Sequence, residues 1–487
     1  MSAWRRHASG ALLLAAFSVL SPVALRAQPQ QASPATTADA PASVDRLVAE
    51  VRRLQQAIDT LQTQLTESRR ESAAVQQSLQ ELREQLEEEQ SLLAAQASTL
   101  EQSKVESGSK YRARIFGMAL MQLVSTRGAV DNIDLPILAV EAEPGDPGGN
   151  VSAAVRQSYI GLAVFGPKVG RFATSGDMRV DFFGGFLDAN DGLSGPNVRL
   201  RTMQIAAEGD RTSIRAGQET PFFSPLSPSS LASTAYPSLA SAGNIWAWTP
   251  QVYIEHRFPR PGNTTWAVRA GVLDSLTGEL PRSEYTRLAT SGERSRMPAY
   301  AGHAGWRRGT DDRVTSLGGG AYYVRHNWAY GRTVNAWAAT ADWELPLSRV
   351  VRLSGELYKG AAIGGLGGGA HSSVLFDGLP SDPASTVFPL HSTGGWAQMK
   401  LKPTPRVEFN LAYGVDRSRP HGFEGLLQPP SDEAPSASRN AGAIANWIYQ
   451  LRSNLFLTVE YHRLWSTRLD GRSWLADHVS LGGAIAF

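Results

Sequence analysis

The stretch Val407-Glu-Phe-Asn-Leu-Ala-Tyr-Gly-Val-Asp416 decides the fold, because its side chains alternate in character at every step. The odd-numbered residues are apolar or aromatic, and the even-numbered residues are polar or small. A period of two is that of a β-strand, whose successive side chains point to opposite faces. The same alternation recurs in residues 177–182, 351–358 and 457–462. We therefore expect residues 107–487 to form an all-β domain.

Two folds produce this alternation. In a soluble sandwich the apolar face forms the core, whereas in a membrane-spanning barrel it contacts lipid and the polar face lines water. The connectors favour the barrel, because short turns alternate with longer loops and a sandwich gives no reason for long loops to gather at one end. The short turns are Gly166–Gly170, Gly209–Arg211, Pro259–Asn263, Gly309–Asp312, Leu345–Ser348, Pro403–Pro405 and Arg452–Asn454. The longer loops cover residues 127–152, 186–197, 219–245, 275–297, 362–392 and 418–438, with two brief ones at 327–332 and 468–473.

Aromatic side chains and the C-terminal strand favour the barrel as well. Tryptophans gather near the expected strand ends, where amphipathic rings would meet a membrane interface. They are Trp246, Trp248, Trp306, Trp328, Trp337, Trp343, Trp396, Trp447, Trp465 and Trp474. Residues 475–487 alternate like the other strands and finish on Phe487, which resembles the assembly signal of bacterial outer-membrane proteins.

The hairpins add up to about sixteen antiparallel strands in a transmembrane barrel, with fourteen or eighteen as alternatives. We expect the strands to start near residues 110, 153, 169, 197, 211, 246, 263, 298, 313, 333, 349, 393, 406, 438, 454 and 474. After residue 27, no apolar run approaches the roughly 20 residues of a membrane helix, so a membrane-spanning form has to use strands. Sixteen strands enclose an aqueous lumen, since much smaller barrels fill with side chains.

The first 27 residues have the pattern of a secretory signal peptide. Arg5 and Arg6 precede an apolar stretch over residues 11–25, and Ala27 is a small residue suited to a cleavage position. The mature chain is therefore expected to leave the cytoplasm. Residues 28–42 are Gln, Ala, Pro and Thr for the most part, a composition that predicts a flexible linker.

Residues 43–106 predict a coiled coil in one uninterrupted heptad register. The a positions are Val51, Ile58, Leu65, Ser72, Leu79, Leu86, Leu93 and Leu100. The d positions are Leu47, Leu54, Leu61, Ser68, Val75, Leu82, Glu89 and Gln96. Twelve of these sixteen positions are apolar, a seam that needs partner helices for its burial. The a/d composition leaves a dimer and a trimer both open, and the alternative is a single helix folded back on the barrel.

Basic residues recur on the expected inner face of adjacent strands. The sequence carries a net charge of +2 overall, which gives no argument for a nucleic-acid partner, but residues 107–487 hold 37 basic and 32 acidic side chains. The arginines that we expect to line an anion pathway are Arg179, Arg199, Arg201, Arg215, Arg257 and Arg269, with Arg307 and Arg325 on the same face. Acidic residues such as Asp181 and Glu255 share this face, so internal charge pairing that stiffens the wall is the alternative role.

A long loop near residues 219–245 is the expected constriction of the lumen. It is rich in Pro, Ser and aromatic residues, a composition suited to a segment that folds inward against the basic wall. Its candidate constriction residues are Glu219, Phe222, Phe223 and Tyr236. The alternative for this segment is an exposed external loop.

The whole arrangement resembles the DcaP-like trimeric porins of Gram-negative outer membranes. The resemblance is carried by Gly176–Gly185, of sequence GDMRVDFFGG, then by Val198–Arg201 and by Ala216–Gln218 before a long loop. It implies a sixteen-stranded barrel, a homotrimer joined by the coiled coil in the periplasm, and passive uptake of small anions, dicarboxylates in particular. The loop after Gln218 departs from the family's Trp-rich stretch. Phosphate-selective porins share the layout and are the nearest alternative.

Enzyme and cofactor functions find little support in the sequence. The chain has no Cys, and its nine His residues form no i, i+4 pair, so we expect no metal site and no cofactor. Phosphate-loop, zinc-protease and Gly-x-Ser-x-Gly motifs do not occur. The expected partners are outer-membrane lipid, further copies of the chain, small anionic solutes, and cell-wall or periplasmic contacts of the coil. A second hypothesis is structural: the barrel serves mainly as an anchor for an envelope-spanning coil.

Overall fold

The computed structural model of the chain describes residues 48–73, 75–76, 80, 112–186, 195–279, 287–310, 313–369, 372–419 and 437–487. The expected signal peptide, the linker and the second half of the expected coiled coil lie outside these residues. The chain divides into two units, residues 1–94 and 95–487, which are described separately below.

The first unit contains a helix over residues 48–73. Its apolar seam is open to solvent in a single chain: Val51, Leu54 and Leu61 are 48%, 60% and 63% exposed. One helix does not test whether several chains coil around one another, so the coiled coil stays a prediction. Among the described helical residues, no helix is long and apolar enough to cross a membrane.

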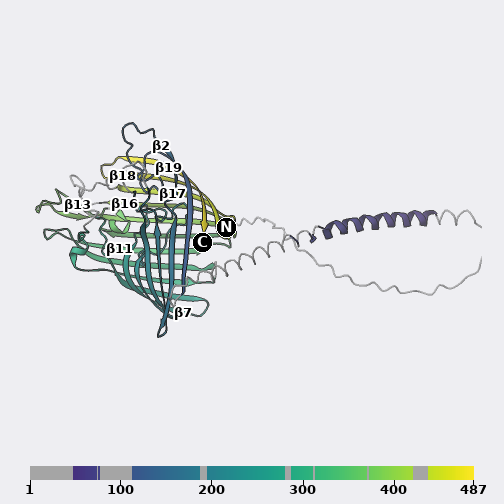
Figure 1. Cartoon of the computed structure of the whole chain (residues 1–487), viewed down its shortest axis with the longest axis horizontal. Coiled ribbons are helices and arrows are strands. Elements are labelled where there is room, and N and C mark those ends of the chain that lie inside the picture. Colours follow the sequence, from purple (N-terminus) through teal and green to yellow (C-terminus); the bar gives the residue numbers. More distant parts are fainter. Residues whose placement is uncertain are drawn as a thin grey trace, which may run out of the picture. The chain divides into compact units, whose positions relative to one another are not determined.

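The second unit is a closed antiparallel barrel (Figure 1). Its strands are β1 (Arg112–Arg127), β2 (Gly149–Ala154), β3 (Tyr159–Val169), β4 (Phe172–Asp181), β5 (Arg199–Glu208), β6 (Thr212–Glu219), β7 (Thr249–Arg260), β8 (Thr264–Leu273), β9 (Ala299–Arg308), β10 (Thr315–Asn327), β11 (Thr333–Pro346), β12 (Val351–Ala361), β15 (His391–Thr404), β16 (Val407–Arg419), β17 (Ala437–Gln450), β18 (Leu455–Arg468) and β19 (Ser473–Ala486). A small hairpin, β13 (Val374–Phe376) with β14 (Val387–Pro389), lies in the connection between β12 and β15.

The barrel wall has sixteen strands, because β2 and β3 share one place in it. Both pair with β1, β2 along its second half and β3 along its first half. The ring closes where β1 pairs with β19, with Met118 opposite Ala486, and where the Gly117 N–H donates to the Phe487 carbonyl at 2.9 Å. The predicted sixteen-stranded antiparallel barrel is therefore confirmed, and each expected strand start lies within about four residues of an observed one.

The connections have the predicted asymmetry. At one end of the barrel, turns of a few residues join consecutive strands, as between β15 and β16. At the other end lie the long segments, including residues 220–248 between β6 and β7 and the connection that carries β13 and β14 (Figure 1). The two ends are therefore called the turn end and the loop end.

The two faces of the wall have opposite polarity, and the apolar face is the outer one. On β16, Leu411 and Tyr413 are 52% and 47% exposed on the outside, while the intervening Asn410 is 1% exposed and faces inward. On β4, Met178 is 37% exposed and Asp181 is completely buried. This is the reverse of a sandwich with a dry core, and it leaves a polar lumen.

Arg325 corrects one sequence-based expectation. It shares a face of β10 with Tyr323, which is 41% exposed, and its Nε donates to the Asn335 side chain at 3.4 Å on the outside of the neighbouring strand β11. The expected inward orientation is therefore wrong. The reason is that β10 carries large apolar residues on both faces, with Tyr322 and Val324 buried inside, so that the usual contrast between faces is lost.

Candidate functional site

Residues 220–248, here called the inner loop, fold into the lumen. Phe223 is completely buried, and its ring stacks on Tyr322 of β10 with 5.3 Å between the centroids. Phe222 stacks on Tyr253 of β7 at 4.6 Å. Because both tyrosines belong to the inner face of the wall, these two rings draw the start of the inner loop inside the barrel.

Polar side chains of the wall then hold the inner loop along its length. The Thr340 hydroxyl of β11 donates to the Phe223 carbonyl at 2.7 Å. Farther along the inner loop, the Ser229 N–H donates to Gln398 of β15 at 2.6 Å. The wall side chains that make the remaining anchors include Glu356, Asn440, Asn446 and Glu460. A buried polar group needs such a partner, so the wall and the inner loop satisfy each other's hydrogen-bonding groups.

The gap between β2 and β3 supplies another anchor. Gln157 lies in this interruption and is completely buried. Its amide nitrogen donates to the Ala232 carbonyl at 2.8 Å, and its amide oxygen accepts the Thr234 N–H at 2.8 Å. The break in the strand thus turns a side chain of the wall onto the inner loop.

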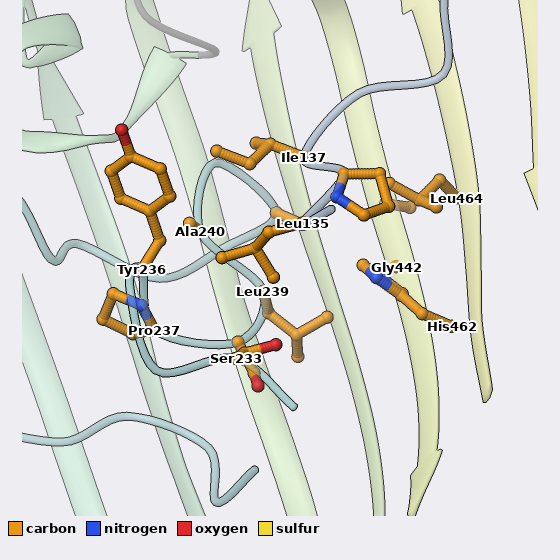
Figure 2. Close-up of a pocket in the computed structure, with 14 residues that line it drawn as sticks. Leu135, Ile137, Ser233, Tyr236, Pro237, Leu239, Ala240, Gly442, His462 and Leu464 are labelled. Carbon is orange, nitrogen blue, oxygen red and sulfur yellow. The ribbon is translucent and has the colours of Figure 1, made fainter. Parts of the chain in front are cut away.

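Glycines allow the inner loop to lie directly on the wall. A Cβ atom at Gly320 would come within 2.3 Å of the Phe223 carbonyl oxygen, and one at Gly414 within 2.2 Å of the Ala242 carbonyl oxygen. Figure 2 shows the end of this contact zone, where Leu239 of the inner loop lines a small cavity together with Leu135 and Leu464 in front of the wall. The cavity that these residues line holds only about 10 Å³, so the packing there is nearly complete.

The inner loop covers one side of the wall and leaves the other side open. Inward side chains of β15 to β19 are buried, as at Gln398, Asn410 and Thr458. Inward side chains of β4 to β8, by contrast, remain partly accessible, as at Arg179 and Arg215. The open part of the lumen therefore lies along the inner face of β4 to β8, which is where most of the arginines predicted from the sequence lie.

Arg199 has a structural role, because all of its contacts are with other groups of the protein. Its guanidinium makes a two-pronged ion pair with Asp181, with nitrogen–oxygen distances of 3.0 and 2.8 Å. It also donates to the Tyr236 hydroxyl and to the Ala235 carbonyl, both at 3.0 Å. Arg199 thereby ties the inner loop to β4 and β5, and its charge is neutralised.

Three further arginines share two glutamates. Arg215 pairs with Glu208 at 2.6 Å, and Arg269 pairs with Glu255 at 2.7 Å. Arg257 lies 3.6 Å from both carboxylates. The group carries one positive charge in excess, so here the wall combines internal pairing with a weakly basic surface.

Arg179 and Arg201 have no acidic partner within ion-pair distance among the residues that the structure describes. A β-bulge brings them together, since Arg179 pairs with Thr202 and Arg201 is the extra residue on β5. Aromatic rings support both: Arg179 lies 5.5 Å from the Phe116 centroid, and Arg201 lies 5.0 Å from that of Trp248. Arg179 also lines a cavity of about 410 Å³ on the open side.

No protein-family model matches the sequence, and no curated protein is similar to it in sequence. Among solved structures, the outer membrane channel DcaP of Acinetobacter baumannii is 17% identical and has a TM-score of 0.58, covering 78% of this chain and 99% of that one. The chain shares the fold of this channel. The resemblance predicted from the sequence is thereby confirmed for the fold.

Two other solved structures are more distant. The anion-selective porin from Comamonas acidovorans is 11% identical with a TM-score of 0.47, covering 78% of this chain and 100% of that one. OprB of Pseudomonas putida is 13% identical with a TM-score of 0.45, covering 77% of this chain and 94% of that one.

The candidate constriction residues lie in different surroundings. Glu219 is the last residue of β6 and follows Arg215 on the inner face by the alternation of the strand. Phe222 and Phe223 are buried in the wall contact, and Tyr236 packs edge-on to Phe183 at 5.4 Å. Sequence reasoning missed Gln157, whose only signal is a polar residue between two strand segments.

Several tryptophans correct the expected membrane-interface belt. Trp246, Trp328 and Trp396 are buried, at 8%, 8% and 2% exposure, and Trp396 packs inside the barrel with Leu239 of the inner loop. Trp248 contacts the guanidinium groups of the lumen. Trp246 and Trp248 belong to the inner loop and Trp396 packs against it, whereas Trp328 packs edge-on to Phe376 of β13.

Within the described ranges, no cluster of three or more His, Asp or Glu side chains could hold a metal ion.

Proposed function

We propose that the chain is an outer-membrane porin through which small anionic solutes, dicarboxylates in particular, diffuse passively. The observation that carries the proposal is the pair Arg179 and Arg201, two cations on the open side of a narrowed lumen with no carboxylate within ion-pair distance among the described residues. Cations that line a pore favour anions through their field. No catalytic step is part of this proposal.

The surroundings of the two arginines suit brief contact with a carboxylate. A guanidinium presents paired N–H groups that match the two oxygens of a carboxylate. Stacking on Phe116 and Trp248 orients these groups, while the neighbouring excess charge of Arg215, Arg257 and Arg269 supplies further attraction. A solute with two carboxylates could then move from one cationic position to the next without leaving water.

The test is electrical recording of the purified full-length protein in a planar bilayer, followed by liposome swelling. In a salt gradient of potassium chloride, we expect open channels whose reversal potential shows a preference for chloride. Swelling should be faster with dicarboxylates than with sugars of equal size. Cation-selective channels would overturn the proposal, faster swelling with phosphate would favour the phosphate-selective alternative, and closed barrels would favour the anchor hypothesis.

We further propose that three chains assemble and that the coiled coil holds them together in the periplasm. The support is the helix over residues 48–73, whose apolar seam is about half exposed in a single chain and calls for partner helices. The helix precedes β1, which starts at the turn end, and in outer-membrane barrels the short turns face the periplasm.

Removing residues 43–104 should weaken this assembly. We expect the trimer to dissociate at a lower detergent concentration or temperature, while each barrel still shows its heat-dependent shift in gel mobility. A matched pair of point variants sharpens the test: Leu54→Asn with Leu61→Asn changes the seam, and Gln56→Ala with Thr63→Ala changes the opposite face. Equal trimer resistance in both pairs would assign the coil another task, such as a cell-wall contact.

A further inference from the structure

A row of basic and hydroxyl side chains crosses the outside of the barrel near the loop end. Its members are Lys359 of β12, Thr393 of β15, Arg417 of β16, Arg439 of β17 and Thr467 of β18. Each is the direct cross-strand partner of the next. Neighbouring strands lie about 4.8 Å apart, so the five side chains form one continuous line, here called the basic row.

Alternation along the strands places the basic row on the outer face. Arg417 shares its face of β16 with Tyr413, which is 47% exposed, and Lys359 shares its face of β12 with Leu357, which is 53% exposed. On β17, Arg439 alternates with Asn440, whose amide contacts the inner loop inside the lumen. The basic row therefore takes no part in the pathway proposed for solutes.

The described residues leave the charges in this row unbalanced. Within the described part of the chain, no acidic side chain lies within ion-pair distance of Lys359, Arg417 or Arg439. Arg417 stands directly opposite Arg439, an arrangement of like charges that destabilises a sheet unless an anion lies between them. The Nε of Arg439 is shielded from solvent and has no hydrogen-bond partner. Arg463, deeper on the same outer face, does have a partner in Asp477 at 3.6 Å.

The neighbouring row on the turn-end side of the basic row is apolar. It indicates at which depth in the membrane the basic row lies. That row consists of Leu357, Gly395, Val415, Ala441 and Trp465. A ring such as that of Trp465 sits at the boundary between acyl chains and headgroups in a membrane. The basic row, one step farther out, is then level with the headgroups of the leaflet at the loop end.

The opposite side of the barrel has no such row. The outward residues in the loop-end halves of β4 to β9 are uncharged. They are Met178, Val180, Leu200, Met203, Ala216, Gln218, Pro250, Val252, Ala270, Val272, Tyr300 and Gly302. Near the loop end, the outer face of β4 to β9 therefore carries no cation among the described residues.

We propose that the basic row binds the phosphate groups of a phosphorylated glycolipid in the outer leaflet, with the apolar row beneath it contacting the acyl chains. Two opposed guanidinium groups flanked by hydroxyls suit a phosphate, which accepts several charge-assisted hydrogen bonds. A free phosphate ion would leave the apolar row without a role, which favours the lipid as the source. The inference rests on the outer-membrane placement proposed above.

The test measures binding of diphosphorylated lipid A to the full-length protein in detergent by native mass spectrometry. Arg417→Gln combined with Arg439→Gln should lower the affinity roughly 30-fold, on the basis of the usual contribution of each basic residue near anionic lipid. Arg260→Gln with Arg308→Gln, the same loss of charge at the turn end, should leave it unchanged. Dephosphorylated lipid A should bind weakly to the unaltered protein.

A stability measurement guards against misfolding of the variant. Without lipid A, the Arg417/Arg439 variant should melt no lower than the unaltered protein, because the opposed like charges are gone. With lipid A, only the unaltered protein should gain thermal stability. Equal lipid A binding in both proteins, or equal binding of dephosphorylated lipid A, would overturn the proposal.

Two other outcomes would show that the basic row binds something other than a lipid. Competition by inorganic phosphate at the affinity of lipid A would assign the row to a free anion, and loss of the trimer in the variant would assign it to a contact between copies. Bilayer conductance is recorded separately without lipid A, so failure of the channel function and failure of lipid binding are distinguishable.

Discussion

Replacing Arg179 and Arg201 together with Gln should lower the preference of the open channel for chloride over potassium about fivefold. The reason is electrostatic: each charge about 8 Å from a path through water is worth roughly 0.5 kcal/mol, and roughly 1 kcal/mol for the two charges together corresponds to about fivefold. Most other cations on this wall are offset by Glu208 and Glu255. The measurement is the reversal potential in a potassium chloride gradient.

Replacing the same two arginines with lysine distinguishes the electrostatic effect of their charges from the specific contacts that a guanidinium makes with a carboxylate. Arg179→Lys with Arg201→Lys keeps both charges, so the reversal potential should stay near that of the unaltered protein. Swelling with dicarboxylates should nevertheless slow, because an ammonium cannot make the paired contacts of a guanidinium. Arg308→Gln, at the turn end of the outer face, is the control. An unchanged reversal potential in the Gln pair would place the selectivity elsewhere in the lumen.

Excising most of the inner loop should raise single-channel conductance about threefold. The cut is feasible because the Ser224 hydroxyl already donates to the Ile245 carbonyl at 3.3 Å, so a short Gly-Ser link can replace residues 225–244. The excised segment fills the lumen beside β15 to β19, and a sixteen-stranded wall without it encloses a much wider aqueous path. The wall itself should persist, because its strand ladders do not involve the inner loop.

The same excision should also reduce discrimination between anions, since solutes would no longer be held close to Arg179 and Arg201. Replacing the exposed tip at residues 143–147 with Gly-Ser of equal length controls for general effects of loop changes. If the excised protein conducts like the unaltered one, the inner loop does not form the narrowest part of the pathway, and the role assigned to it here is wrong.

The strands were predictable because lipid and water impose opposite demands on alternate side chains. Residues 407–416 show this clearly, and β16 begins at Val407 within one residue of the expected start. The prediction weakened where the inner loop covers the wall. There Tyr322 and Val324 are buried inside while Tyr323 faces outward, so that β10 loses its contrast and Arg325 was assigned to the wrong face.

The pairing of the arginines could not be read from the sequence. Arg199 is held by Asp181 because the register of β4 and β5 makes the two residues direct cross-strand neighbours. Arg201 escapes pairing because a bulge inserts it opposite a residue that already has a partner. Neither registers nor bulges leave a mark in composition or spacing, which is why six arginines with one predicted role turn out to have different ones.

The pairing of β1 with β19 has a consequence for the synthesis and folding of the barrel. Met118 meets Ala486, so the ring is completed by segments that are synthesised far apart in time. Until both are present, β1 exposes an unpaired edge, and such edges invite aggregation and proteolysis. Contacts of this sequence separation also form slowly. A polypeptide that is truncated or cleaved between these two strands cannot close the barrel. Incomplete chains therefore keep an unpaired strand edge and are expected to be degraded or to aggregate.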